Sequence, residues 1–292
     1  MIDGVLVCDK PAGMTSHDVV ARVRRLAGQR RVGHGGTLDP PATGVLVVAL
    51  GRATRLLPYL PMEPKRYLAV IAFGAETDTL DAAGTVVAEA DAAEVDGPAL
   101  ERALAGFLGV QEQVPPMVSA VKVGGERLYA KARRGETVER KPREVTIHAL
   151  ELRELAGGER PVATVVVTCS GGTYVRALAA DLGRALGTLA HLASLRRTAA
   201  GSFGEADAHP LDELQALADG GRLGEVVIDP ATALAPLGVR PVSAREAIAL
   251  ASGQTLGPTG RDGPVAAVGP DGHLVAVIQD GDGVARSRVV LA

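Results

Sequence analysis

The chain has 292 residues, of which 47% are hydrophobic and 22% are charged, a composition typical of a globular protein. No stretch approaches the roughly 18 apolar residues of a membrane-spanning helix, and the first residues lack the basic and apolar regions of a secretion signal, so we expect a soluble, cytoplasmic protein without membrane contact. The formal net charge of −3 is unevenly distributed, with +5 over residues 1–75, −8 over 76–113, +6 over 114–200 and −6 over 201–292.

The first predicted elements are a strand over residues 4–10 and a helix over residues 17–27, with Thr15 or Ser16 as the N-cap. The apolar residues of this helix fall on one face and its arginines on the other. Further strands are predicted over residues 45–50, 67–74, 145–153 and 162–169. Further helices are predicted over residues 98–108, 126–134 and 174–186.

Beyond residue 236 the pattern of predicted elements changes. A short helix is expected over residues 243–252, followed by β-like runs over 264–268, 273–279 and 284–291. We therefore predict two domains, a larger one over 1–236 and a small β-rich one over 237–292. Strands and helices in the larger domain do not alternate regularly, which indicates an α+β fold with a mixed, largely antiparallel central sheet and flanking helices.

The segment over residues 32–44 holds four glycines and two prolines around the carboxylate of Asp39. Because glycine and proline interrupt regular structure, we expect a shaped loop throughout this segment rather than the interior of a helix or strand. Taken alone, a surface turn in which Asp39 bonds its own backbone is the better interpretation. The apolar run that follows favours the alternative, a reactive carboxylate mounted on a sheet.

Neither a metal site nor a disulfide framework is expected. Cys8 and Cys169 lie in apolar strand-like runs, and neither belongs to a CxxC pair. The histidines are scattered, without HExxH or a comparable spacing. The chemistry is therefore predicted to be metal-free.

Two basic clusters favour a nucleic-acid partner over plain solvated helix faces, because a polyanion responds to the local patch of charge rather than to the net charge of the protein. The clusters are Arg22, Arg24, Arg25, Arg30 and Arg31, then Lys122, Arg127, Lys131, Arg133, Arg134, Arg140, Lys141 and Arg143.

Three tyrosines, Tyr67, Tyr129 and Tyr174, each lie next to cationic residues. This arrangement is suited to stacking a base, although the position of a tyrosine at the edge of the core explains each one equally well.

A second glycine turn, Ser170-Gly171-Gly172, lies between a strand and a helix and offers either a phosphate cradle or a plain strand-to-helix connection. The lysine of a P-loop is missing, which excludes that kind of NTPase.

The motifs of the chain resemble those of the TruB family of bacterial tRNA pseudouridine synthases. They follow one order over about 200 residues: Asp9-Lys10-Pro11-Ala12-Gly13-Met14-Thr15-Ser16, Gly33-His34-Gly35-Gly36-Thr37-Leu38-Asp39-Pro40-Pro41-Ala42-Thr43-Gly44, Lys65-Arg66-Tyr67, Thr77-Asp78-Thr79, Ser119-Ala120-Val121-Lys122, Gly172-Thr173-Tyr174-Val175-Arg176 and Leu195-Arg196-Arg197. Two positions depart from the pattern. Gly35 stands where threonine is usual, and Val118 where an aromatic residue is frequent.

The resemblance implies a pseudouridine synthase fold, a PUA-like C-terminal domain and a role for each motif residue. Asp39 would be the catalytic aspartate, Tyr67 would pack on the target base, and Arg176 would pair with Asp39. His34 would enter the RNA loop, and Leu195 would line the pocket. Tyr174 would support the site, and Lys10 would support the catalytic loop.

The implied activity is isomerisation of uridine to pseudouridine at position 55, in the T loop of tRNA, by a monomer. The reaction involves no net redox change or hydrolysis, so no cofactor is expected. Two alternatives stay open: a non-catalytic RNA-binding or tRNA-folding factor, and a relative that works within a guide-RNA particle.

Overall fold

The computed structural model describes residues 2–116, 122–123, 126–127 and 140–291. Contacts divide the chain into two compact units, and each is described by itself. Unit 1 combines residues 1–62 with 200–292, and unit 2 consists of residues 63–199. The predicted division into domains, 1–236 and 237–292, stays a prediction.

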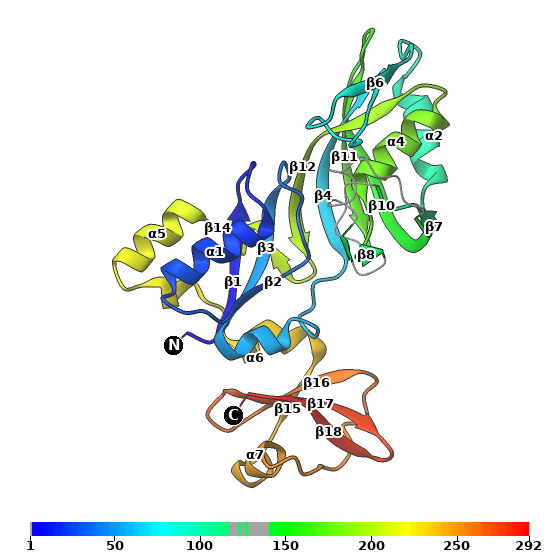
Figure 1. Ribbon diagram of the computed structural model, residues 1–292. Helices are drawn as coiled ribbons and strands as arrows, with labels where there is room; N and C mark the ends of the chain where they lie inside the picture. Colours follow the sequence, from blue (N-terminus) through cyan, green and yellow to red (C-terminus); the bar gives the residue numbers. More distant parts are fainter. Residues whose placement is uncertain (1, 117–121, 124–125, 128–139, 292) are drawn as a thin grey trace. The chain divides into compact units, whose positions relative to one another are not determined.

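The first part of unit 1 is a small mixed sheet with helices packed on it (Figure 1). Its strands are β1 (Gly4–Lys10), β2 (Val32–Gly35), β3 (Thr43–Leu50) and β14 (His209–Pro210), and the two-residue β13 (Phe203–Gly204) contacts β3. Its α-helices are α1 (Ser16–Leu26), α5 (Leu211–Asp219) and α6 (Pro230–Leu234), and its 3₁₀ turns are η1 (Gly51–Leu56), η2 (Glu205–Asp207), η3 (Leu223–Val226) and η4 (Ala235–Leu237). β3 runs antiparallel to both β1 and β2, whereas β14 runs parallel to β1.

The strand and the helix predicted at the start of the chain are confirmed. Thr15 is the N-cap of α1, and its side-chain oxygen accepts a hydrogen bond from the backbone N–H of Asp18 at 3.1 Å. The Asp18 carboxylate in turn accepts from the backbone N–H of Thr15 at 2.8 Å. This reciprocal capping box fixes where the helix begins.

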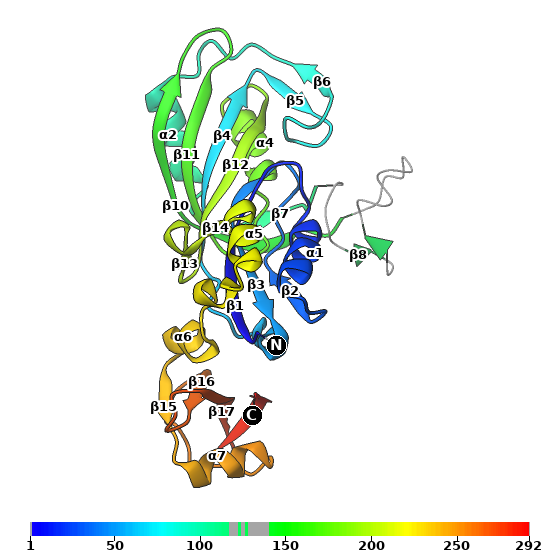
Figure 2. The ribbon, with the colours of Figure 1, turned by 90° about the vertical axis from the view of Figure 1, so that its left-hand side faces the viewer.

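The sheet of unit 1 carries apolar side chains on both faces. Helices α1 and α5 lie side by side over one face, as Figures 1 and 2 both show. The core beneath them contains Leu6, Cys8, Val19, Val20, Val23, Leu46, Val48, Leu214 and Leu223. The alternation along β1 sends Val5 and Val7 into a second core on the opposite face.

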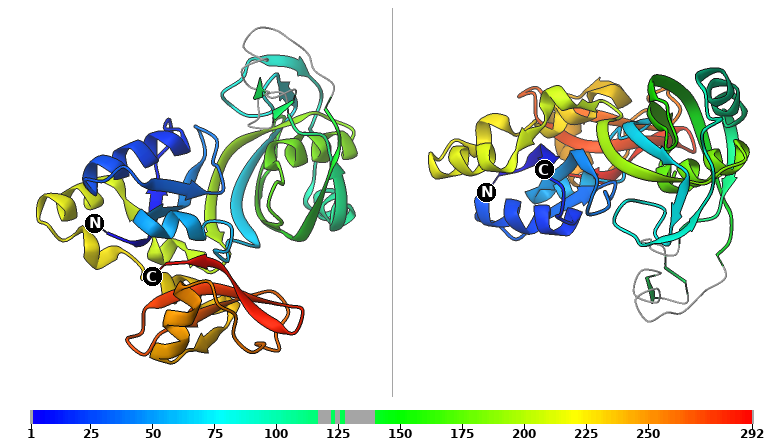
Figure 3. Two further views of the ribbon diagram at one scale, coloured as in Figure 1. Left: turned by 60° about the horizontal axis from the view of Figure 1, so that its bottom comes forward. Right: turned by 90° about the horizontal axis from the view of Figure 1, so that it is seen from above.

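The last part of unit 1 is a four-stranded sheet with helix α7 (Ala244–Ala251) packed on it (Figure 3). Its strands, in sheet order, are β15 (Val239–Pro241), β16 (Pro264–Val268), β17 (Leu274–Gly281) and β18 (Val284–Val290). The helix and the β-like runs predicted beyond residue 236 are therefore confirmed.

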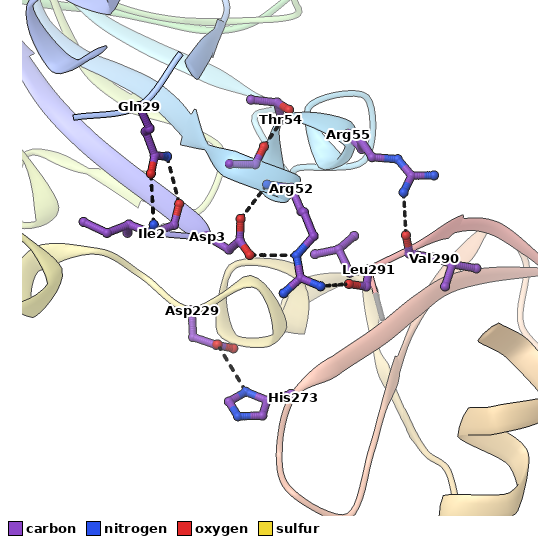
Figure 4. Close-up of polar contacts among 11 residues, drawn as sticks. Ile2, Asp3, Gln29, Arg52, Thr54, Arg55, Asp229, His273, Val290 and Leu291 are labelled. Atoms are coloured by element: carbon purple, nitrogen blue, oxygen red, sulfur yellow. Dashed lines mark hydrogen bonds and ion pairs between the residues drawn. The ribbon is translucent and has the colours of Figure 1, made fainter. Parts of the chain in front are cut away.

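This small sheet is attached to the start of the chain through polar and apolar contacts. Arg52 donates to the carboxylate of Asp3 at 2.7 Å and to the carbonyl oxygen of Leu291 (Figure 4). Arg55 donates to the carbonyl oxygen of Val290 at 2.7 Å. The second core continues from β1 and β3 into the small sheet, where it includes Ala266, Leu274, Val277, Val289 and Leu291.

Unit 2 is built on an antiparallel sheet. Its strands, in sheet order, are β12 (Ala190–Ala200), β4 (Lys65–Phe73), β11 (Val162–Cys169), β10 (Arg143–Ala156) and β7 (Gly109–Gln113). Two short pairs of strands accompany it, β5 (Ala75–Thr77) with β6 (Val86–Glu89) and β8 (Lys122–Val123) with β9 (Glu126–Arg127). Helices α2 (Gly97–Gly106) and α4 (Val175–Ala185) contact each other and the sheet (Figure 1). The expected α+β class with a largely antiparallel sheet is confirmed.

Two sequence predictions are wrong in part. Residues 32–35 form strand β2 rather than a loop, because pairing with β3 compensates for the low strand propensity of glycine. A Cβ at Gly35 would lie 2.3 Å from the Met62 sulfur, so a larger residue at this position requires the flexible end of Met62 to move. The helix predicted over 126–134 is contradicted at residues 126–127, which form β9; its remaining residues lie outside the described part of the chain.

Candidate active site

Lys10 fixes the loop that carries Asp39. It ends strand β1 and is fully buried. Its ammonium group donates to the carbonyl oxygens of Pro11 at 2.9 Å, Pro40 at 3.1 Å and Ala42 at 2.6 Å. Burying a charge is costly unless hydrogen bonds satisfy it, and two of these acceptors, the carbonyl oxygens of Pro40 and Ala42, lie on the carboxyl side of Asp39. The lysine therefore holds the turn that follows the aspartate.

Ser16 holds the other side of the same loop. Its hydroxyl donates to the carbonyl oxygen of Leu38 at 3.1 Å and accepts from the backbone N–H of Leu38 at 2.9 Å. Leu38 itself is buried, and Asp39 is only partly exposed. The carboxylate is thus mounted between two anchored neighbours. Sequence reasoning had considered Ser16 only as a possible helix cap and missed this role.

His34 lies in β2, opposite Val48 on β3. Its ring meets the ring of His17, from α1, edge to face, with the centroids 5.2 Å apart and the planes at 85°. The flexible end of Met62 packs against the neighbouring Gly35. The position of His34 is therefore set from the sheet and from the helix.

Arg176 is held by the turn between β5 and β6 of unit 2. The arginine is 4% exposed, and its Nη1 donates to the carbonyl oxygen of Thr79 at 2.9 Å. The same nitrogen lies 3.6 Å from the Asp81 carboxylate. Asp81 is held in turn, because its Oδ1 accepts from the Thr79 hydroxyl at 2.7 Å and from the backbone N–H of Ala83 at 3.1 Å. These contacts fix the direction of the guanidinium group.

Tyr67 lies on β4, is 7% exposed, and accepts a hydrogen bond from the fully buried Arg197 of β12. Burial raises the pKa of the Tyr67 phenol above its usual range, and the positive charge and hydrogen bond of Arg197 oppose this shift only in part. The phenol is therefore protonated at neutral pH. Sequence reasoning had included Arg197 in a motif without assigning it a role.

Tyr174 forms the N-cap of α4, where its backbone N–H donates to the Gln113 side chain at 2.9 Å. Leu195 lies half-buried on β12. In the glycine turn before α4, the backbone N–H of Gly171 donates to the Glu63 carboxylate at 2.6 Å. This turn thus binds an acidic group of its own chain at the place where a phosphate cradle was considered.

The predicted site residues divide between the two units. Lys10, His34 and Asp39 belong to unit 1, whereas Tyr67, Tyr174, Arg176 and Leu195 belong to unit 2. Within unit 1 the structure brings Lys10 onto the Asp39 loop. Val118, whose departure from the family pattern was noted, lies outside the described residues.

Among the residues that the structure describes, no group of three or more His, Cys, Asp or Glu side chains has the arrangement of a metal site. Over the same residues, no helix has both the length and the apolar character needed to cross a membrane.

Three family models together match most of the chain. The model of the TruB family pseudouridylate synthase N-terminal domain matches residues 24–175. The chain belongs to the TruB family. The model of the tRNA pseudouridylate synthase B C-terminal domain matches residues 176–234, and that of the tRNA pseudouridine synthase II C-terminal region matches residues 237–292.

Curated relatives agree with this membership. A protein named tRNA pseudouridine synthase B from Thermobifida fusca is 48% identical over 100% of this chain and 99% of its own length. One of the same name from Symbiobacterium thermophilum is 57% identical over 74% of this chain and 72% of its own length. Membership of the family, recognised from the motifs, is confirmed, and so is the assignment as an isomerase that forms pseudouridine.

Solved structures are similar to the chain over nearly its whole length. A chain in the crystal structure of a Cbf5-Nop10-Gar1 complex matches with a TM-score of 0.74 and 26% identity, over 99% of this chain and 85% of that chain. A chain of the archaeal box H/ACA sRNP Nop10-Cbf5 complex matches with a TM-score of 0.70 and 27% identity, over 94% of this chain and 78% of that chain. The expected pseudouridine synthase fold is confirmed.

Proposed function

We propose that this chain isomerises uridine 55 in the T loop of tRNA to pseudouridine, as a monomer without a cofactor and with Asp39 as the catalytic carboxylate. The full-length relatives named tRNA pseudouridine synthase B support tRNA as the substrate. The proposal includes the division into a catalytic domain over 1–236 and a PUA-like domain over 237–292. Residues 237–292 carry five arginines against five acidic residues, so this domain has no net positive charge to attract a polyanion, and it makes only modest direct contact with RNA.

The anchoring of the Asp39 loop is the observation that carries the proposal. A carboxylate that attacks a sugar or a base must be held near its target, because positioning supplies a large part of such a rate enhancement. Lys10 holds the turn after Asp39, and Ser16 holds Leu38 before it. A surface turn that bonds only its own backbone has no need of a buried lysine.

In the proposed reaction the bond between N1 and C1′ breaks, the uracil rotates, and a bond forms between C5 and C1′. The proton on C5 leaves, and N1 gains one, so atoms and charge balance. The Asp39 carboxylate forms a transient bond either to C1′ of the ribose or to C6 of the base, and both routes fit the residues present. Arg176 serves as the counter-ion that keeps Asp39 ionised in a desolvated pocket.

The remaining residues bind the flipped nucleotide. His34 enters the RNA loop and occupies the space of the extruded bases, while the ring of Tyr67 packs on the target uracil. Leu195 lines the pocket, and Tyr174 supports it. Unstacking a base costs a few kcal/mol, which these contacts offset.

Tyr67 also has a candidate chemical role, removal of the C5 proton. The raised pKa of its phenol means that a reactive phenolate forms only through local stabilisation, for which the neighbouring Arg197 is the available cation. Tyr67→Phe separates the roles. Formation of the covalent adduct with stalled release of pseudouridine supports proton removal, whereas near-normal turnover contradicts it.

The test of the proposed function is to incubate the full chain with an unmodified tRNA transcript and map pseudouridine by position. Wild type is expected to modify position 55, and Asp39→Asn is expected to lose at least about 1,000-fold in rate, as expected for a reactive carboxylate. Asp212→Asn, an exposed aspartate of α5, is the matched control and is expected to retain full activity. Product formed at the wild-type rate by Asp39→Asn would refute the proposal.

The same assay tests the two alternatives. The similarity to chains of Cbf5 complexes favours a second candidate, a synthase that needs partner proteins and a guide RNA. That candidate predicts no product from the isolated chain and bare tRNA. A tRNA-folding factor would bind the transcript and leave every uridine unchanged.

A further inference from the structure

His17 and His34 form an aromatic pair next to the Asp39 loop. His17 comes from the first turn of α1 and is exposed, whereas His34 comes from β2 and is partly exposed. Their ring centroids are 5.2 Å apart, and the rings meet edge to face at 85°. This geometry is one of the favourable arrangements of two aromatic rings. Sequence reasoning assigned a role to His34 alone.

The backbone on both sides of His17 is fixed. Ser16 is buried and exchanges two hydrogen bonds with Leu38, while Asp18 closes the capping box with Thr15. The hydrogen bonds from Thr15 keep the pKa of the Asp18 carboxyl below its usual range, with smaller contributions from the nearby His17 and Lys10. Asp18 is therefore ionised at neutral pH, and the first turn of α1 that presents the His17 ring is preserved.

The ring of His17 is placed for two tasks. The contact with His34 restricts the orientation of the His34 ring. The exposed surface of the His17 ring is available to an RNA base beside His34. Proteins that bind unpaired RNA stack bases on aromatic side chains, histidine included. The arginines of the same helix, Arg24 and Arg25, are exposed and supply positive charge for the RNA backbone.

We propose that His17 is a second RNA-binding residue of the site: it orients His34 and stacks on an unpaired nucleobase of the RNA loop that His34 enters. This inference rests on the proposed function, in which the substrate is the T loop of a tRNA. It assigns His17 a contribution to RNA binding and none to the making or breaking of bonds.

The test compares tRNA binding and single-turnover pseudouridine formation by the full-length chain carrying His17→Ala or His17→Phe. His17→Ala is expected to weaken binding of an unmodified tRNA transcript about 3- to 10-fold, the range that an aromatic contact provides, with a smaller loss of rate at saturating tRNA. His17→Phe retains a ring and is expected to recover most of the binding. His148→Ala, an exposed histidine of β10, is the matched control and is expected to bind like wild type.

The double variant His17→Ala/His34→Ala tests whether the two rings act together. Because each single change already disrupts the pair, the double variant is expected to bind more tightly than the product of the two single effects predicts. A merely structural role of His17 would lower the melting temperature and would give the same binding deficit for Ala and Phe, and this result would overturn the proposal. Unchanged binding by His17→Ala would overturn it as well, and so would independent effects of the two histidines.

Binding measured in an Asp39→Asn background separates this inference from the proposed function. If wild type forms no pseudouridine in tRNA, the proposed function fails, whatever His17 does to binding. If wild type modifies position 55 and His17→Ala binds unchanged, only the inference about His17 fails.

Discussion

Replacing the buried Lys10 by methionine tests how the Asp39 loop is held. Methionine has nearly the same length and fills the same space, but it cannot donate to the carbonyl oxygens of Pro11, Pro40 and Ala42. We expect the variant to fold with a loosened loop and to lose activity out of proportion to its loss of stability.

The magnitude follows from opposing effects. A hydrogen bond from a charged donor contributes about 1.5–3 kcal/mol, and Lys10 donates to three carbonyl groups. Methionine avoids the cost of burying an ammonium ion, which offsets several kcal/mol of this loss. We therefore expect the free energy of unfolding to fall by about 2–3 kcal/mol. A displacement of Asp39 by about 1 Å would slow product formation about 100-fold.

Urea denaturation gives the free energy of unfolding, and single-turnover pseudouridine formation at saturating tRNA gives the rate. Lys141→Met, which replaces an exposed lysine, is the control and should change neither the stability nor the rate at saturating tRNA. A folded Lys10→Met variant with a wild-type rate would refute the idea that the ammonium group positions Asp39.

Three further changes test other parts of the structure. Gly35→Thr requires the flexible end of Met62, 2.3 Å from the added Cβ, to move, and should therefore reduce the free energy of unfolding by only about 1 kcal/mol; Met62→Ala in the same chain should remove this contribution in urea denaturation. Asp81→Asn removes the carboxylate 3.6 Å from Arg176, the proposed counter-ion of Asp39, and should slow single-turnover product formation at least about 10-fold. Burial raises the pKa of Cys8 to about 12 and that of Cys169 to about 11, from an ordinary value of 9.0, so the folded state keeps protons that the unfolded state loses. Stability should therefore decline as the pH rises above about 9, by at most about 1.4 kcal/mol per pH unit for each thiol.

Each change has a contradicting outcome. Additive effects of the glycine and methionine changes would show that their contact is not the source of the strain. A fully active Asp81→Asn variant would mean that the arginine is positioned without the carboxylate. An unchanged alkaline decline after both cysteines are replaced by alanine would assign that decline to other groups.

The sequence predicted elements best where an apolar run is bounded by strong turn residues. The bounds of β1 and β16 agree with the predictions, since glycine, proline or aspartate marks their ends. Strand β2 was missed because glycine was read as a strand breaker. Local propensity cannot anticipate the pairing with β3 or the Met62 side chain that occupies the space beside Gly35.

In the candidate site, the sequence identified motif residues but not what holds them. The motif Thr77-Asp78-Thr79 was recognised, but Asp81, which lies just beyond it, was not connected with Arg176. Only folding brings the turn between β5 and β6 to helix α4, and no spacing along the chain encodes that contact. The same holds for Arg197, whose position beside Tyr67 depends on how β12 lies next to β4.

Unit 1 is assembled from both ends of the chain, and this affects how the protein is made. Arg52 and Arg55 bond to the carbonyl oxygens of Leu291 and Val290, so residues that are made early contact residues that are made much later. Residues 63–199 form a compact unit of their own and can collapse while synthesis continues. The core shared by β1, β3 and the small sheet can close only after β16, β17 and β18 have been made. A nascent chain is therefore expected to form the Asp39 loop early, with Lys10 and Ser16, and to bury Val5 and Val7 fully only after residue 291 has left the ribosome.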